Sequence, residues 1–186
     1  MRRVAALVLL VLLLCGCGSE NDGLDCAMVL RQKLLSAENC SFLATITADY
    51  GDSIYTFGMQ CQMNSSGDIT FQVTEPETIS EITGMISEFG GGLTFDDHLL
   101  GFEPMADGTA TPVIAPWLML RSLRGGYIKS CIETEQGYTL ILDDTYQSVN
   151  LRTEVHLNQQ SHPVFAELYY DEKRILTISV SNFEML

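Results

Sequence analysis

The hydrophobic positions along the chain repeat with two different periods, which separate a predicted helix from predicted strands. From Leu24 to Glu38 apolar residues recur every three or four positions, and this spacing predicts an amphipathic helix. After Cys40 the period drops to two. Alternation over 42–48 and 55–61 predicts an antiparallel hairpin, and residues 69–73 predict a third strand that ends before Pro76.

The segment from Pro76 to Phe89 fits both periods. Its isoleucines at positions 79, 82 and 86 have roughly helical spacing, but those at 82 and 86 also alternate with Gly84 between them. We predict a strand, because the glycines at 90–92 are typical of a hairpin return. A helix would place Gly84 in its middle at a cost of about 1 kcal/mol.

A second helix is predicted from Pro116 to Arg124, after a proline-punctuated loop over 102–116. Proline suits the first turn of a helix, and Gly125-Gly126 can end it. Apolar side chains cover most of its circumference. A helix that is apolar on nearly all sides must be buried or must cover a cavity.

The last third of the chain returns to strands, over 127–133, 138–142, 148–157, 164–170 and 174–183. About nine strands and two helices are expected altogether, which makes the fold class mainly β within α+β. Sequential hairpins predict one strongly curved antiparallel sheet rather than two domains, with an N-terminal helix and an inserted apolar helix.

The N-terminus carries the pattern of a secretory signal. Arg2 and Arg3 precede an apolar run over 4–14, which is too short to span a hydrocarbon core that needs about 20 residues. The run ends in Leu14-Cys15-Gly16-Cys17, the order of a lipobox. We therefore predict a signal peptide over 1–16, a lipid such as palmitate on Cys17, a tether over 17–23 and one domain over 24–186.

Charge narrows the classes of partner. Without residues 1–16 the chain has 170 residues, and its eight basic and 24 acidic residues give a net charge of −16. No lysine or arginine lies between Leu34 and Leu120, where twelve acids occur. Such a surface repels phosphate backbones, so nucleic-acid binding is disfavoured, and membrane attachment is expected through the lipid on Cys17 alone.

Four cysteines remain in the domain, and outside the cytoplasm an even number suggests disulfides. If Tyr50-Gly51 were a two-residue hairpin loop, Asp49 would face Asp52 and Cys40 would lie directly opposite Cys61. This register favours a Cys40–Cys61 disulfide. It leaves Cys26 and Cys131 either joined or free.

Catalytic and metal signatures are weak. No GxSxG motif occurs, and the histidines at 98, 156 and 162 are scattered singly, so no catalytic residues and no enzyme activity are expected. The acidic pairs Asp96-Asp97 and Asp143-Asp144 lack the spacing of a calcium loop and are interpreted as turn residues. We expect no metal and no cofactor.

Aromatic and methionine side chains admit two readings, packed core or the lining of a cavity for a hydrophobic ligand. Basic residues near the second helix likewise admit two roles, capping that helix or meeting the head group of an anionic amphiphile at the cavity mouth. The candidate ligand-binding residues are Phe57, Met59, Phe71, Trp117, Met119, Leu120, Arg121 and Arg124.

These features together resemble the LolA and LppX-like group of bacterial envelope proteins. The runs 106–108, 111–113, 115–117 and 125–128 (Ala-Asp-Gly, Thr-Pro-Val, Ala-Pro-Trp and Gly-Gly-Tyr-Ile) look like those of a little-characterised set of lipoproteins within it. The resemblance implies an unclosed barrel that wraps around helices and encloses an apolar cavity for acyl chains. It carries over no individual ligand residue.

We therefore expect a lipoprotein on the extracytoplasmic side of the cell membrane that binds or carries a hydrophobic or amphipathic ligand without covalent chemistry. The alternative is an envelope module for protein–protein interaction or sensing, with a filled core and an unknown protein partner. A hollow space between the second helix and the sheet would favour the first reading.

Overall fold

A computed structural model describes residues 22–103, 105–106, 109–146 and 148–186 of the chain. The predicted signal peptide, Cys17 and most of the predicted tether lie outside these residues. No helix among the described residues has the length and apolar character needed to cross a membrane.

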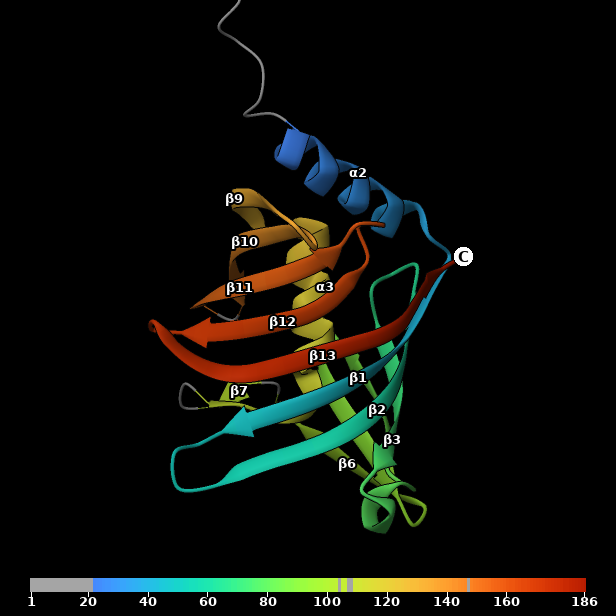
Figure 1. Cartoon of the computed structure of the whole chain (residues 1–186). Coiled ribbons are helices and arrows are strands. Elements are labelled where there is room, and N and C mark those ends of the chain that lie inside the picture. Colours follow the sequence, from blue (N-terminus) through green and yellow to red (C-terminus); the bar gives the residue numbers. More distant parts are fainter. Residues whose placement is uncertain (1–21, 104, 107–108, 147) are drawn as a thin grey trace, which may run out of the picture.

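One antiparallel sheet of eleven strands forms the body of the protein and curves around its core without closing into a barrel (Figure 1). Its strand order is β6-β5-β4-β3-β2-β1-β13-β12-β11-β10-β9. The strands are β1 Asn39–Asp49, β2 Ile54–Asn64, β3 Ile69–Glu75, β4 Thr83–Ser87, β5 Gly90–Phe95, β6 His98–Phe102, β9 Tyr127–Thr134, β10 Gly137–Tyr146, β11 Val149–Asn158, β12 Pro163–Tyr170 and β13 Lys173–Met185. The prediction of a single curved antiparallel sheet is confirmed.

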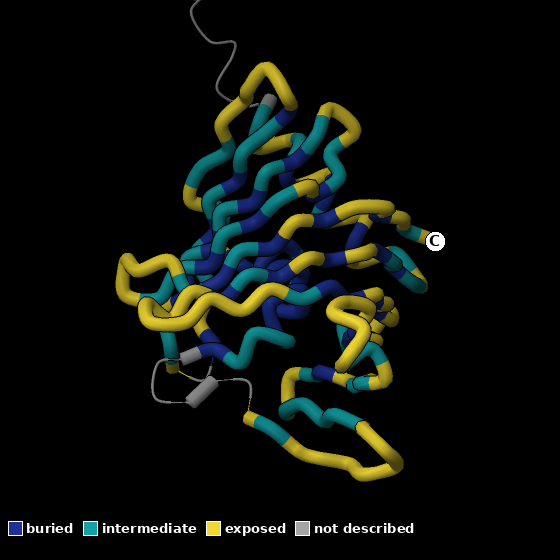
Figure 2. Tube along the Cα trace, turned by 60° about the horizontal axis from the view of Figure 1, so that its bottom comes forward, coloured by how far each residue is buried: buried dark blue, intermediate teal, exposed yellow. Residues whose placement is uncertain are grey.

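The two halves of the sheet meet where β1 pairs with β13, two strands far apart in the sequence. Ile46 lies opposite Ile178 in this pairing, and both side chains are fully buried. In the central strands, such as β1 and β11, alternate residues face the concave side and the others face outward, so the buried positions form bands across the sheet (Figure 2).

Helix α3, Ala115–Gly125, lies inside the curve of the sheet and fills the core, as its apolar character predicts (Figure 1). Every residue from Ala115 to Leu120 is buried. A short 3-10 helix, η2 Pro112–Ile114, leads into it, and a two-stranded ribbon, β7 Met105–Ala106 and β8 Thr109–Ala110, lies within the segment predicted as a loop.

Helix α2, Asp22–Ser36, lies across one end of the curved sheet, beside the C-terminal end of α3 (Figure 1). Ala27, Leu30 and Leu34 form its buried stripe, as the spacing predicts. The helix begins at Asp22, so its first residues overlap the end of the predicted tether. Leu24, Met28 and Leu35 form a second apolar stripe that is about half exposed, with accessibilities of 46, 50 and 54%.

The ambiguous segment after Pro76 contains one turn of 3-10 helix, η1 Glu77–Ile79, followed by β4. Strands β4 and β5 form the predicted hairpin through Ser87 and Gly90. The side chain of Phe71 lies over Gly84, where a Cβ atom would sit 2.5 Å from the ring. Gly84 is therefore a strand residue that makes room for an aromatic ring of the neighbouring strand.

The predicted register of the first hairpin is wrong. Asp49 pairs with Ile54, so the loop has four residues rather than two, and Cys40 lies opposite Met63. The longer loop is held by the Asp49 carboxylate, which accepts the N–H of Gly51 at 2.8 Å, and by the Tyr50 N–H, which donates to the Ser53 carbonyl at 3.0 Å.

Candidate functional site

Three of the predicted ligand-binding residues share one face of α3. Trp117, Arg121 and Arg124 follow one another at helical spacing and line a pocket of about 360 Å³. The other walls come from Leu35 of α2, the β2–β3 turn over 66–68, Glu88, Gly125 and Asp144. We call this hollow the Arg124 pocket.

Trp117 forms the apolar wall of the Arg124 pocket. Its indole N–H donates to the carbonyl oxygen of Gly67 at 3.1 Å, which satisfies the one polar atom of a ring that is otherwise buried. The ring meets Tyr146 edge to face, with centroids 5.2 Å apart. Both contacts fix the indole, so the wall is rigid.

Arg121 is fully engaged by the protein itself. Its Nε donates to Glu88 at 3.0 Å, Nη1 donates to Asp144, and Nη2 donates to the carbonyl oxygen of Thr145 at 3.2 Å. Burial alone would lower the pKa of Arg121, but hydrogen bonds and charges from Glu88 and Asp144 outweigh burial and raise it. Arg121 therefore joins α3 to β10 and to the β4–β5 turn, rather than offering a free charge.

Arg124 has fewer hydrogen-bond partners than Arg121. Its Nη2 donates to the carbonyl oxygen of Ser65 at 2.9 Å, and its Nη1 lies 4.0 Å from the sulfur of Met63. The buried Nε has no hydrogen-bond partner among the described residues, and no described carboxylate forms an ion pair with this guanidinium. Gly67, with a φ of +93°, leaves the space that the guanidinium occupies.

The predicted apolar lining lies elsewhere. Met59, Phe71, Met119 and Leu120 have accessibilities of 0 to 4% in the core, and Phe57 packs against that core half-buried. None of these five side chains lines the Arg124 pocket. Their contact with a ligand stays a prediction, and it would require the core to open.

Sequence reasoning missed the carboxylates that surround Arg121. Asp143 and Asp144 lie within β10 and not in a turn, so that interpretation is wrong. Because adjacent strand residues face opposite sides, Asp143 pairs with Lys129 at 3.7 Å while Asp144 reaches Arg121. Asp96 and Asp97 do form the turn between β5 and β6, with φ values of 49° and 60°.

A second hollow of about 550 Å³ lies beyond Gly125 and Gly126, on the other side of the end of α3. Both of its basic side chains already form ion pairs, Lys129 with Asp143 and Arg152 with Glu172 at 2.8 Å. The Arg152 guanidinium also lies 4.3 Å from the ring of Tyr169. This hollow is more polar than the Arg124 pocket and less suited to an apolar group.

The four domain cysteines are free thiols in this structure. Cys40 and Cys61 lie on neighbouring strands and face the core, two residues away from direct opposition. Burial raises the pKa of each thiol to about 12, and the nearby Cys40 adds to the effect on Cys61. The Cys40–Cys61 disulfide stays a prediction, but the strand register from which it was predicted is not the one observed.

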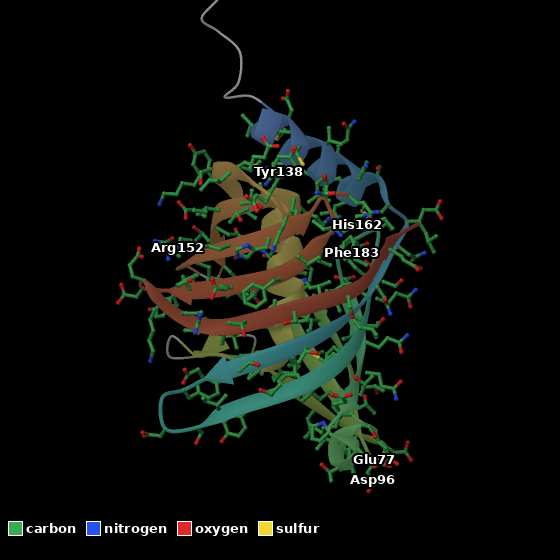
Figure 3. The ribbon with its side chains drawn as sticks, in the orientation of Figure 1. Glu77, Asp96, Tyr138, Arg152, His162 and Phe183 are labelled. Carbon is green, nitrogen blue, oxygen red and sulfur yellow. The ribbon has the colours of Figure 1, made fainter. Side chains whose placement is uncertain are left out.

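The histidines lie apart from one another. The His162 ring is tilted against the Phe183 ring near α2, with centroids 5.7 Å apart (Figure 3). His156 contacts Thr139 and Phe165, and His98 is exposed on β6. Ser122, which is buried on α3, contacts Thr153 and Asp144 instead of a histidine. Within the described ranges, no three His, Cys, Asp or Glu side chains gather closely enough to hold a metal ion.

Comparison with solved structures identifies the fold. A DUF1329 family protein from Desulfovibrio piger ATCC 29098 matches with a TM-score of 0.50 and 9% identity, over 91% of this chain and 94% of that chain. A putative outer membrane lipoprotein-sorting protein domain from Vibrio parahaemolyticus matches with a TM-score of 0.50 and 8% identity, over 90% and 93%. A LolA superfamily protein from Nitrosomonas europaea matches with a TM-score of 0.47 and 10% identity, over 86% of this chain and 93% of that chain.

The predicted resemblance to the LolA and LppX-like group is confirmed as a likeness of fold. No protein-family model and no curated protein matches the sequence.

Proposed function

We propose that this chain is a lipid-anchored envelope protein that binds an amphipathic ligand in the Arg124 pocket without covalent chemistry. The observation that carries the proposal is the meeting of an apolar wall, Trp117 and Leu35, with a cation that has no carboxylate partner among the described residues, Arg124. The volume of about 360 Å³ lies at the lower end of the range for small-molecule sites, which suits a head group and the first part of a chain.

Charge in the pocket limits the ligand. Glu88 and Asp144 neutralise Arg121, so Arg124 supplies the cation that a phosphate or carboxylate would meet. Asp68 also lines the pocket and would repel a ligand with several negative charges. We therefore expect a ligand with one anionic group, or a zwitterion whose cationic part meets Asp68.

The exposed stripe of α2 connects the pocket with the expected membrane. Leu24, Met28 and Leu35 follow one side of the helix, and Leu35 also lines the Arg124 pocket. If Cys17 carries a lipid, Asp22 follows it by five positions, a span of at most about 18 Å. An acyl chain in the pocket would then continue along α2 toward the bilayer.

Native mass spectrometry of the delipidated domain, expressed without Cys17, tests ligand binding. We expect one acyl-phosphate or acyl-carboxylate probe to bind per chain, and uptake to fall when Trp117 is changed to Ala. A domain that carries no lipid after purification and takes up no probe would refute the proposal.

A second candidate function is an envelope interaction module, and one observation favours it. The core around α3 is packed, while Phe89, Leu99 and Leu100 near the β6 end of the sheet have accessibilities of 98, 76 and 60%. An extended segment of a protein partner could add a strand to β6 and cover these side chains. Cross-linking from Leu99 in cells to one defined protein, together with no probe uptake, would favour this function over ligand binding.

A further inference from the structure

The first turn of α2 rests directly on Cys131 of β9. A Cβ atom built at Gly23 would lie 3.1 Å from both the sulfur and the carbonyl oxygen of Cys131. Such distances are shorter than ordinary carbon contacts, so a larger residue at position 23 would require α2 or Cys131 to shift by a few tenths of an ångström. Gly23 thus brings the backbone of α2 onto this cysteine.

Cys26 lies one helical turn after Gly23, on the same face of α2. Side chains three residues apart on a helix have Cβ atoms about 5–6 Å apart, so Cys26 extends toward the strand that Gly23 touches. Its sulfur lies 3.1 Å from the hydroxyl oxygen of Ser161 in the β11–β12 turn, and both cysteines are only half-buried.

Electrostatics agree with this placement. Burial and, to a smaller extent, the charge of a Cys26 thiolate together raise the pKa of the Cys131 thiol to about 11, and the second contribution requires the two thiols to be near each other. The two sulfurs are therefore neighbours in the folded chain, although 105 positions separate them in the sequence.

We propose that Cys26 and Cys131 form a disulfide that fastens α2 to β9, the end strand of the sheet. The inference rests on the envelope location in the proposed function, because disulfides form and persist in an oxidising compartment. An external disulfide, either oxidised glutathione or an oxidised dithiol protein, is the oxidant. One cysteine thiolate attacks it and releases a thiol, and the second cysteine then displaces the other sulfur.

The products balance. Two cysteine thiols lose two electrons and two protons, and the external disulfide takes both up to become two thiols. Because burial holds Cys131 in its protonated form at neutral pH, closure in the folded chain is expected to be slow without a catalyst and to become faster with rising pH.

A disulfide at this place would fix the helix that carries Leu35, and Leu35 lines the Arg124 pocket. It would also hold the end strand β9 against a helix, so that α2 could not swing away from that edge. The bond would therefore keep one wall of the pocket in place.

Tryptic mapping separates this bond from the other pairing. Trypsin cleaves after Arg31, Lys129 and Arg152, so Cys26 and Cys131 fall in separate peptides, the second spanning residues 130–152. No lysine or arginine lies between Leu34 and Leu120, so Cys40 and Cys61 stay in one peptide. Only a Cys26–Cys131 bond, and not a Cys40–Cys61 bond, links the 130–152 peptide to the one that ends at Arg31.

One sample, the untreated one, is alkylated in the cells before extraction in detergent, so that free thiols are blocked. A second sample is extracted without alkylating agent, treated with oxidised glutathione and only then alkylated. Both are mapped without reductant. We expect the linked peptides before treatment. Linked peptides only after treatment would uphold the pairing and contradict the envelope location. Fully alkylated Cys26 and Cys131 in both samples would overturn the pairing.

Stability gives a second readout. We expect reductant to lower the Tm of the wild-type protein by roughly 5–15 °C and to leave Cys26→Ser/Cys131→Ser unchanged. Each single variant should match the double variant, because either change removes the whole bond. A reductant effect as large in the double variant as in the wild type would assign the whole effect to Cys40 and Cys61 and would contradict the proposal.

Discussion

Arg31 of α2 donates from its Nε to the carbonyl oxygen of Leu123 in the last turn of α3, at 2.8 Å. A second bond runs from its Nη2 to the carbonyl oxygen of Gly126. The last carbonyls of a helix have no partner within that helix, and a cation is favoured there by the helix dipole. One helix thus caps the other, and the pair is held together at the end next to the Arg124 pocket.

Replacing Arg31 by Ala should lower the free energy of unfolding by about 1–3 kcal/mol, because two carbonyl groups lose a charged donor. Arg31→Lys should lower the free energy of unfolding by most of the same amount, since an ammonium group cannot reproduce the forked geometry of the guanidinium. Chemical denaturation measures the change. Lys33→Ala, at an exposed position of the same helix, should stay within about 0.5 kcal/mol, and an equal loss there would contradict the capping role.

The glycines of the β4–β6 region offer a matched pair. A Cβ atom at Gly84 would lie 2.5 Å from the Phe71 ring and 2.6 Å from the carbonyl oxygen of Gly92, whereas one at Gly101 would meet nothing within 4 Å. Gly84→Ala should therefore destabilise the protein by about 1–3 kcal/mol, and Gly101→Ala should be close to neutral or stabilising. Thermal unfolding of both variants decides this, and equal behaviour would show that the strands shift to make room.

Local patterns predict much of this fold because the positions that alternate with period two become the buried face of one sheet. Phe42, Ala44 and Ile46 are such positions, and all three are buried. The pairing of β1 with β13 has no local signal. The predicted register of the first hairpin is wrong because the Asp49 carboxylate accepts the Gly51 N–H and favours a longer loop. Residue spacing alone does not reveal this interaction.

The candidate site, like the fold, has a part that local spacing predicts and a part that depends on contacts between distant residues. Helical spacing places Trp117, Arg121 and Arg124 on one face of α3 and predicts their meeting. The partners of Arg121 are Glu88, 33 positions before it, and Asp144, 23 positions after it, and neither lies near it until the chain folds. The sequence therefore predicts the cations but not which of them stays available.

Alkaline pH should destabilise the protein through its two core thiols. Burial raises the pKa of both Cys40 and Cys61 from 9.0 to about 12, so the unfolded chain releases their protons first as the pH rises. This stability is present below pH 9 and is lost between pH 9 and 12, at about 1 kcal/mol per thiol between pH 9 and 10.

Denaturation of the wild type and of Cys40→Ala/Cys61→Ala at pH 8 and pH 10 isolates this contribution. The difference in stability between the two pH values should be about 3 kcal/mol smaller in the double variant, because other titrating groups are shared. An unchanged difference in the non-reduced protein, restored to the expected size by reductant, would instead demonstrate the predicted Cys40–Cys61 disulfide.

Ligand binding should depend on Arg124 and not on cations in general. Arg124→Gln removes the pocket cation that lacks a carboxylate partner among the described residues, and we expect roughly tenfold weaker retention of an acyl probe with one anionic group. Lys129→Gln removes the same charge from a side chain that lines the neighbouring hollow, and it should leave retention unchanged. Displacement of a fluorescent fatty acid measures both. A similar loss in both variants would indicate a general effect of charge.

The anchor can be separated from the fold at Cys17. With a net charge of −16 outside the predicted signal peptide, the domain is repelled by anionic head groups, so attachment should rely on the lipid. We expect Cys17→Ala to leave the membrane fraction and to keep its Tm, while Cys15→Ala stays anchored. The mass of the N-terminal peptide should show the acyl group only when Cys17 is present.

A Cys17→Ala protein that remained with the membrane could be held by the exposed stripe of α2, and adding Leu24→Ser, Met28→Ser and Leu35→Ser would then release it. Retention even after these changes would show that the lipobox interpretation is wrong and that another part of the chain binds the membrane.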